Sequence, residues 1–116
     1  MQPRDLNTYL QDVLDAGADI QAYTQAKTWD DYLQSSITRA AVERKFAIIG
    51  EALNQALIHH PELRGRIREA RDIVDFRNRV MHGYFSIEDR LVWSTIQVGL
   101  PELLMEVKTL LQERSL

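Results

Sequence analysis

Apolar residues recur at the three- and four-residue spacing of an α-helix along most of the chain, and no segment alternates as a strand would. A first helix is expected from about Arg4 to about Thr24, with Pro3 suited to its first turn. Thr28 and Asp31 have the spacing of a capping box, which predicts a short helical piece after them. That piece carries Trp29, Tyr32 and Leu33, and we interpret Tyr32, together with Trp93 of the last helix, as a packing residue.

The second long helix is expected from about Ser36 to about His59, with Pro61 ending it. Its apolar residues form two groups on different sides: Ile37, Ala41, Ile48 and Ala52, and Phe46, Ile49, Leu53 and Leu57. A helix that is apolar on most sides is buried on most sides, so it lies either at the centre of the protomer or against a second subunit. In so short a chain we favour the second arrangement, a homodimer.

A turn from Leu63 to Ala70 runs into a third helix that continues to about Met81. Ser86 and Asp89 predict the start of a final, leucine-rich helix, which Pro101 should kink or divide. The expected fold is therefore all-α: one domain over residues 1–116, an antiparallel bundle of four to five helices, assembled as a homodimer.

Composition narrows the class of protein. A hydrophobic content of 45% and a charged content of 27% are those of a soluble globular domain, and no apolar run could span a membrane. The absence of cysteine rules out disulfides and thiolate zinc sites and fits a cytoplasmic location. The net charge of −3 argues against a general nucleic-acid coat, but residues 64–79 hold six arginines against three carboxylates, a local charge of +3.

The most unusual polar chemistry lies between Arg77 and Tyr84. On the predicted third helix Arg77 falls inside the apolar arc, while Asn78 and His82 are four residues apart on one face. One interpretation is structural: Arg77 pairs with Glu51 of the second helix, and His82 caps its own helix. The other is catalytic, because histidine can move a proton and arginine can stabilise charge developing on a phosphodiester.

The catalytic interpretation favours RNA and no metal. The sequence offers no convincing cluster of metal-ligating side chains, since His59 and His60 are better placed as cations at a helix C-terminus. RNA supplies its own nucleophile in the 2′-hydroxyl group. A single histidine cannot easily act as base and acid on opposite sides of a phosphorus, whereas a two-fold dimer that brings two copies together can.

The motif Arg77-x4-His82-x-Tyr84 resembles that of HepT-like toxins in the HEPN superfamily. The segments Ala41–Asn54 and Tyr84–Trp93 are also similar to the family's second helix and last connection. The resemblance implies a homodimeric, metal-independent endoribonuclease toxin with Arg77 and His82 as the catalytic pair and Asn78 in support. It further implies an antitoxin partner, a minimal nucleotidyltransferase that uses ATP and Mg²⁺ to adenylylate Tyr84. The substrate would be an RNA such as tRNA or mRNA.

Two other functions stay open on the sequence. The chain could be a catalytically silent helical subunit that docks a nucleotidyltransferase and binds nucleotide or RNA. It could also be a purely structural interaction bundle. The intact pair of Arg77 and His82 favours the nuclease over both.

Overall fold

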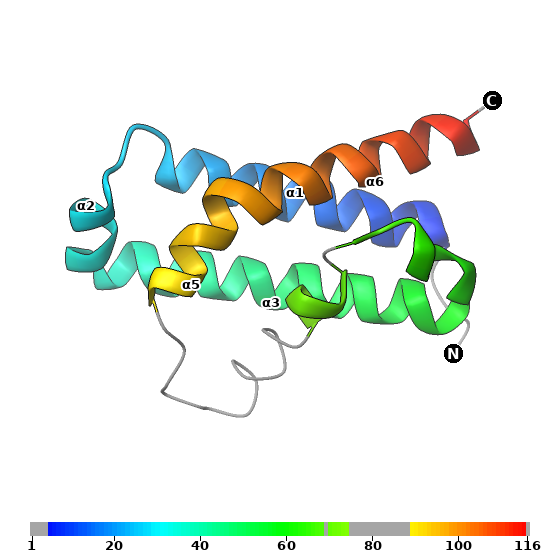
Figure 1. The fold of residues 1–116 in the computed structure, drawn as a ribbon, viewed down its shortest axis with the longest axis horizontal. Helices are drawn as coiled ribbons and strands as arrows, with labels where there is room; N and C mark the ends of the chain where they lie inside the picture. The colour runs from blue at the N-terminus through cyan, green and yellow to red at the C-terminus, as the bar shows by residue number, and fades with distance from the viewer. Residues whose placement is uncertain (1–4, 69, 75–88, 116) are drawn as a thin grey trace.

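The computed structural model describes residues 5–68, 70–74 and 89–115, and these residues contain helices and connections but no strand (Figure 1). The α-helices are α1 (Leu6–Thr24), α2 (Trp29–Gln34), α3 (Ser36–His59), α5 (Asp89–Ser94) and α6 (Leu100–Arg114). Residues 70–74 are also helical, η1 (Pro61–Gly65) is a 3-10 helix, and η2 (Thr95–Gly99) is a π-helix. The predicted all-α class is confirmed.

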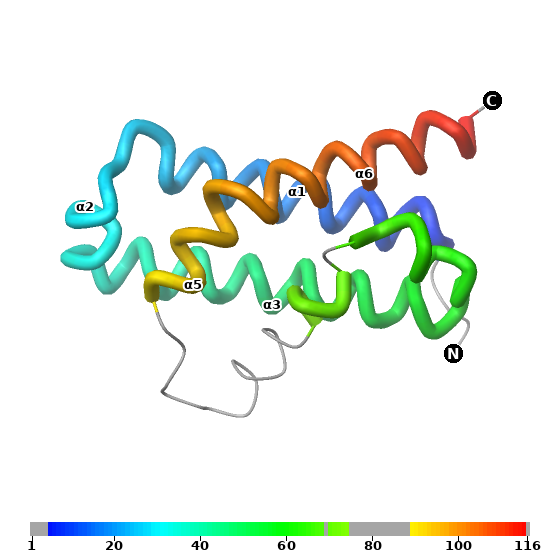
Figure 2. The backbone as a smooth tube through the Cα atoms, in the orientation of Figure 1, coloured from blue at the N-terminus to red at the C-terminus, as the bar shows by residue number. Residues whose placement is uncertain are grey.

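Three long helices, α1, α3 and α6, run side by side and form the body of the molecule (Figure 2). The chain runs along α1 in one direction and returns along α3 and α6, so α1 is antiparallel to both. Their inward side chains are almost completely excluded from solvent and form one core, which includes Leu10, Val13, Phe46, Ile49, Leu53, Leu100 and Leu103. Burial of such side chains is the main favourable contribution to folding.

Local capping signals mark the beginnings of α2 and α3 where the sequence predicts them. The Thr28 hydroxyl accepts a hydrogen bond from the Asp31 backbone N–H at 3.1 Å, and Asp31 accepts one from the Thr28 N–H at 3.0 Å. The hydrogen bond that the Asp31 carboxylate accepts from the Thr28 backbone N–H, helped by the Thr28 side chain, lowers the pKa of Asp31. Ser35 caps α3 by accepting from the Thr38 N–H at 3.2 Å, and α3 ends at His59, just before Pro61. The capping box and both bounds of the second long helix are confirmed.

The close approach of α1 and α6 depends on Gly17. A Cβ atom at this position would lie 2.5 Å from Leu104 Cδ2, well inside van der Waals contact. Glycine therefore allows the backbone of α1 to pack directly against a buried leucine of α6.

The final helical stretch is divided just before Pro101. The Leu100 N–H donates to the Thr95 carbonyl, five residues earlier, which is the pattern of a π-helix turn. Proline has no N–H, and its ring would collide with the carbonyl four residues before it in a regular α-helix. The wider turn accommodates that conflict, so the predicted interruption is confirmed. The described part of this stretch begins at Asp89, and the predicted cap at Ser86 lies outside the described residues.

Candidate functional site

The predicted motif falls in the interval 75–88. Arg77, Asn78, His82 and Tyr84 therefore lie outside the described residues, and their roles stay predictions. The structure describes the framework on either side of this interval, which ends at Val74 before it and resumes at Asp89 after it.

Helix α3 runs past both flanks of that interval. On one flank, Ile73 is buried in the core, and Val74 lines a hollow together with Asn54 of α3. On the other flank, the carboxylate of Asp89 acts electrostatically on Glu43 of α3. Glu43 and Asn54 are roughly 16 Å apart along the helix axis at 1.5 Å per residue. The described chain on both sides of the motif thus lies beside α3.

Glu51, the residue predicted to pair with Arg77, lies on α3 between those two points. Its side chain is half-buried and accepts a hydrogen bond from Gln55 Nε2 at 3.4 Å. Because Arg77 is outside the described residues, its pairing with Glu51 stays a prediction.

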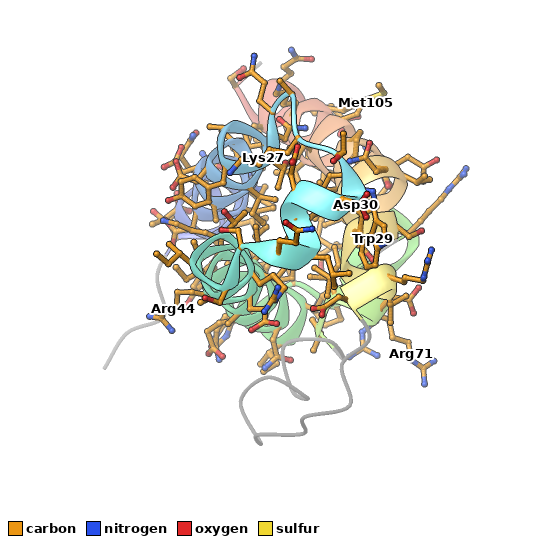
Figure 3. The ribbon with its side chains drawn as sticks, turned by 90° about the vertical axis from the view of Figure 1, so that its left-hand side faces the viewer. Lys27, Trp29, Asp30, Arg44, Arg71 and Met105 are labelled. Atoms are coloured by element: carbon orange, nitrogen blue, oxygen red, sulfur yellow. The ribbon has the colours of Figure 1, made fainter. Side chains whose placement is uncertain are left out.

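The basic segment at residues 64–79 contributes to a concave surface. Its hollow has a volume of about 590 Å³, and the lining residues come from α3 and from the chain that follows it: Asn54, Leu57, Ile58, Arg64, Ile67, Arg68, Ala70, Arg71 and Val74. We call this surface the arginine groove, after its three exposed arginines. Figure 3 shows the Arg71 side chain extending away from the bundle.

Arg66 differs from the arginines of the groove. Its Nη2 atom donates to both carboxylate oxygens of Glu113, at 2.7 and 2.8 Å, and so joins the segment after α3 to the end of α6. Within the described residues, the side chains of Arg64, Arg68 and Arg71 make no comparable ion pair. Their guanidinium groups are therefore not occupied by any carboxylate of the described residues.

An aromatic cluster lies at the opposite end of the bundle, where α2 meets α5. Trp29, Tyr32 and Trp93 pack with ring centroids 5.3–6.4 Å apart, and the Arg90 guanidinium lies 4.9 Å from the Trp29 ring centroid. Burial raises the pKa of Tyr32, and the nearby carboxylates of Asp89 and Glu43 raise it further. The prediction that Tyr32 and Trp93 serve in packing is confirmed, since Tyr32 is fully buried and Trp93 packs against the core.

Histidines and carboxylates do not gather into a metal-binding cluster in the described ranges, where no group of three or more such side chains occurs. His59 lies in the last turn of α3, and the neighbouring His60 has its Nδ1 atom 3.4 Å from Glu62 Oε1. None of the helices among the described residues combines the length and hydropathy that crossing a bilayer requires.

Comparison with known proteins gives a consistent result. A family model described as "Ribonuclease HepT-like" matches residues 13–110. A protein of Thermococcus cleftensis named "Probable ribonuclease HepT" is 31% identical over 86% of this chain and 90% of its own length. A Methanocaldococcus jannaschii protein named as a "Putative RNase" is 27% identical over 93% of this chain and 98% of its own length.

A second Methanocaldococcus jannaschii protein, named as both a gamma-glutamylcyclotransferase and an RNase, is 28% identical over 95% of this chain. The chain spans 49% of that longer relative. No solved structure is significantly similar to the chain.

Proposed function

Because the chain belongs to the HepT-like ribonuclease family, we propose that it is a metal-independent endoribonuclease toxin whose active site is built from Arg77 and His82. The observation that carries the proposal is the complete Arg77-x4-His82-x-Tyr84 motif in a chain that matches this family over residues 13–110. The α-helical framework supports it, because α3 runs past both flanks of the motif.

In this mechanism His82 accepts the proton of an RNA 2′-hydroxyl group as the 2′-oxygen attacks the adjacent phosphorus. The bond from phosphorus to the 5′-oxygen breaks, and a second imidazole donates a proton to that oxygen. The products are a 2′,3′-cyclic phosphate and a 5′-hydroxyl end. Arg77 binds the phosphate and stabilises the charge that develops on its oxygens, while Asn78 supports the same group.

The second imidazole comes from a second copy of the chain in a two-fold dimer. Support for a dimer comes from α3. The apolar side that carries Ile37, Ala41, Ile48 and Ala52 is incompletely covered within one protomer. Ile37 is 83% exposed, and Ala41 and Ile48 are only half-buried, whereas Ala52 is buried. Burying the uncovered apolar groups against another copy would be favourable.

Regulation in this proposal acts on Tyr84. A nucleotidyltransferase antitoxin transfers AMP from ATP to the phenol oxygen and releases pyrophosphate, with Mg²⁺ bound by that partner. The added phosphate brings negative charge and bulk beside a site that has to accept RNA phosphate. Adenylylation therefore inhibits cleavage.

Cleavage of RNA by the purified chain tests the catalytic pair. Arg77→Ala and His82→Ala should each abolish both cleavage and growth arrest while the oligomeric state, measured by analytical ultracentrifugation, stays that of wild type. Arg44→Ala is a suitable control, because Arg44 is exposed on α3 and extends away from the bundle (Figure 3). Full toxicity of either active-site variant would overturn the assignment. A wild-type chain that binds a nucleotidyltransferase but cuts no RNA would instead identify a silent docking subunit.

Adenylylation is tested by intact-mass measurement after incubation with the nucleotidyltransferase, ATP and Mg²⁺. Wild type should gain the mass of AMP, and Tyr84→Phe should not. Undiminished addition to Tyr84→Phe would place the modification elsewhere. Tyr23→Phe is the matched control, since Tyr23 is a partly exposed tyrosine on α1.

A further inference from the structure

The arginine groove combines three cations with an apolar floor. The cations are Arg64, Arg68 and Arg71. The apolar floor consists of aliphatic side chains from α3, Leu57 and Ile58, and from the chain that follows it, Ile67 and Val74. No aspartate or glutamate lines the hollow in the part of the chain that the structure describes. The groove is therefore a local concentration of positive charge on a chain whose net charge is −3.

The usual explanation for exposed arginines is a solvated helix face on which cations alternate with carboxylates. Arg66, in the same segment, is instead neutralised across the fold by Glu113 of α6, which binds its guanidinium. The three groove arginines do not fit that explanation either, since no described carboxylate pairs with them and all three border one concave surface. Like charges gathered around a hollow repel one another and attract an anion into it.

The backbone anchors this segment independently of the arginine side chains. The Arg68 N–H donates to Glu106 Oε2 of α6 at 3.1 Å, and the buried side chains of Ile67 and Ala70 join the core on either side of it. The guanidinium groups are therefore carried on a fixed support. Replacing them should leave the fold intact.

We propose that the arginine groove binds the phosphodiester backbone of single-stranded RNA. It would extend the substrate site on the N-terminal side of the motif. This inference rests on the proposed ribonuclease function. The guanidinium groups contact phosphates, and unpaired bases pack on the aliphatic floor. A volume of about 590 Å³ lies within the range of roughly 300–1,000 Å³ of small-ligand sites and suits nucleotide-sized groups.

The groove is placed to guide RNA toward the proposed catalytic pair. Val74, which lines it, is the last described residue before the interval 75–88 and precedes Arg77 by three positions in the chain. RNA held in the groove would therefore lie next to the last described residue before the motif. Single-stranded RNA is favoured over duplex RNA because bases can reach an apolar floor only when they are unpaired.

Affinity for RNA is the first test, measured in a His82→Ala background so that the probe is not cut. The probe is a fluorescein-labelled single-stranded oligouridylate, followed by anisotropy over a range of salt concentrations. The triple variant Arg64→Gln, Arg68→Gln, Arg71→Gln should bind at least ten-fold more weakly. It should also reduce the slope of log K against log salt by about 0.7 for each phosphate that the variant no longer binds.

The matched control for each single groove variant, Arg64→Gln, Arg68→Gln or Arg71→Gln, is Arg66→Gln, which also removes one charge from the same segment but outside the groove. It should keep the wild-type affinity and salt slope to within about two-fold. A loss of affinity in Arg66→Gln as large as in the single groove variants would mean that net charge alone matters, and would overturn the proposal. Circular dichroism melting of all these variants checks that the fold is retained.

Cleavage kinetics distinguish this proposal from the proposed function. On a dinucleotide, which occupies only the scissile position, the triple variant should keep the wild-type kcat and KM. On a longer single-stranded RNA its KM should rise several-fold at unchanged kcat. If wild type cleaves RNA and the triple variant matches it on both substrates, the groove proposal fails while the nuclease stands.

A protein-docking role is the competing outcome. If the triple variant binds RNA normally but is no longer adenylylated by the nucleotidyltransferase, the groove is a protein interface, and the RNA assignment is wrong. If wild type binds RNA through the groove without cutting it, the nuclease proposal fails and the groove assignment survives. Duplex RNA competing as well as single-stranded RNA would overturn the role of the apolar floor.

Discussion

The aromatic ring of Tyr32 in α2 lies 5.3 Å from that of Trp93 in α5, at an interplanar angle of 38°. Trp29 packs against both rings, and the Arg90 guanidinium lies over the Trp29 ring. The cluster therefore joins the short helix before α3 to the helix that follows the motif. The described chain after residues 75–88 is therefore fixed by aromatic packing.

Tyr32→Phe should leave the free energy of unfolding unchanged or raise it by up to about 1 kcal/mol. The Tyr32 hydroxyl is buried and has no hydrogen-bond partner among the described residues, so folding removes it from water without compensation. Urea denaturation of both proteins measures the difference. Tyr32→Ala should instead destabilise the fold by about 3–5 kcal/mol, because it leaves a cavity beside Trp93. A Tyr32→Phe variant that is strongly destabilised would show that the hydroxyl has a partner.

Glu43→Gln should stabilise the protein at neutral pH. Burial raises the pKa of Glu43 above its ordinary value of 4.5, and the neighbouring Asp89 raises it further. A carboxyl group whose pKa is higher in the folded state costs stability once it ionises, so the cost grows as the pH rises through its titration. The gain from Glu43→Gln should therefore be present at pH 7 and vanish in acid, below about pH 4.

Thermal melting at a series of pH values measures this dependence. Asp72→Asn, which neutralises an exposed carboxylate outside the core, is the comparison. A stabilisation by Glu43→Gln that persists unchanged into acid would mean that the side-chain charge is not its cause.

Ser35→Ala should destabilise the fold by about 1 kcal/mol, the usual effect of losing an N-cap. The Ser35 hydroxyl accepts from the Thr38 N–H and also donates to the Thr38 hydroxyl at 2.9 Å. Ser36→Ala, one residue later and exposed, removes a hydroxyl that makes neither bond and should change stability by less than about 0.5 kcal/mol. Equal effects of the two substitutions on the urea midpoint would contradict the capping role.

Gly17→Val should destabilise the packing of α1 against α6 by about 1–3 kcal/mol. Its Cβ atom would fall within 3.2 Å of three side-chain atoms of Leu104, so this buried side chain would have to shift. Gly65→Val is the matched control, since a Cβ atom there meets nothing within 4 Å. Differential scanning calorimetry compares the two, and a Gly17→Val protein as stable as Gly65→Val would show that Leu104 repacks freely.

The helices were predictable because their signals are local. The capping box at Thr28 and Asp31, the Ser35 cap and the stop at Pro61 each act within a few residues, so the bounds of α3 agree with those expected. The division of the last helix at Pro101 was also expected, but the π-turn before it was not. Relief of the proline conflict can take several backbone forms, and packing selects among them.

The grouping of the arginines could not be read from their spacing. Residues 64–79 indicated only a basic segment, within which Arg66 and Arg68 have the same kind of neighbours in sequence. The folded chain brings Glu113 of α6 to Arg66 and leaves Arg64, Arg68 and Arg71 around a hollow beside α3. This separation depends on the meeting of residues more than 40 positions apart.

By itself the sequence determined the helical class, most helix bounds, and the family through a short motif and its flanks. Only the tertiary structure decided which of the described arginines form ion pairs with described carboxylates. It also decided why position 17 is a glycine and that the Tyr32 ring is buried against Trp93. The physical reason is the distance along the sequence over which each interaction acts. Hydrogen bonds of caps and helical periodicity are set by residues within one or two turns, whereas burial and charge pairing depend on which distant surfaces meet.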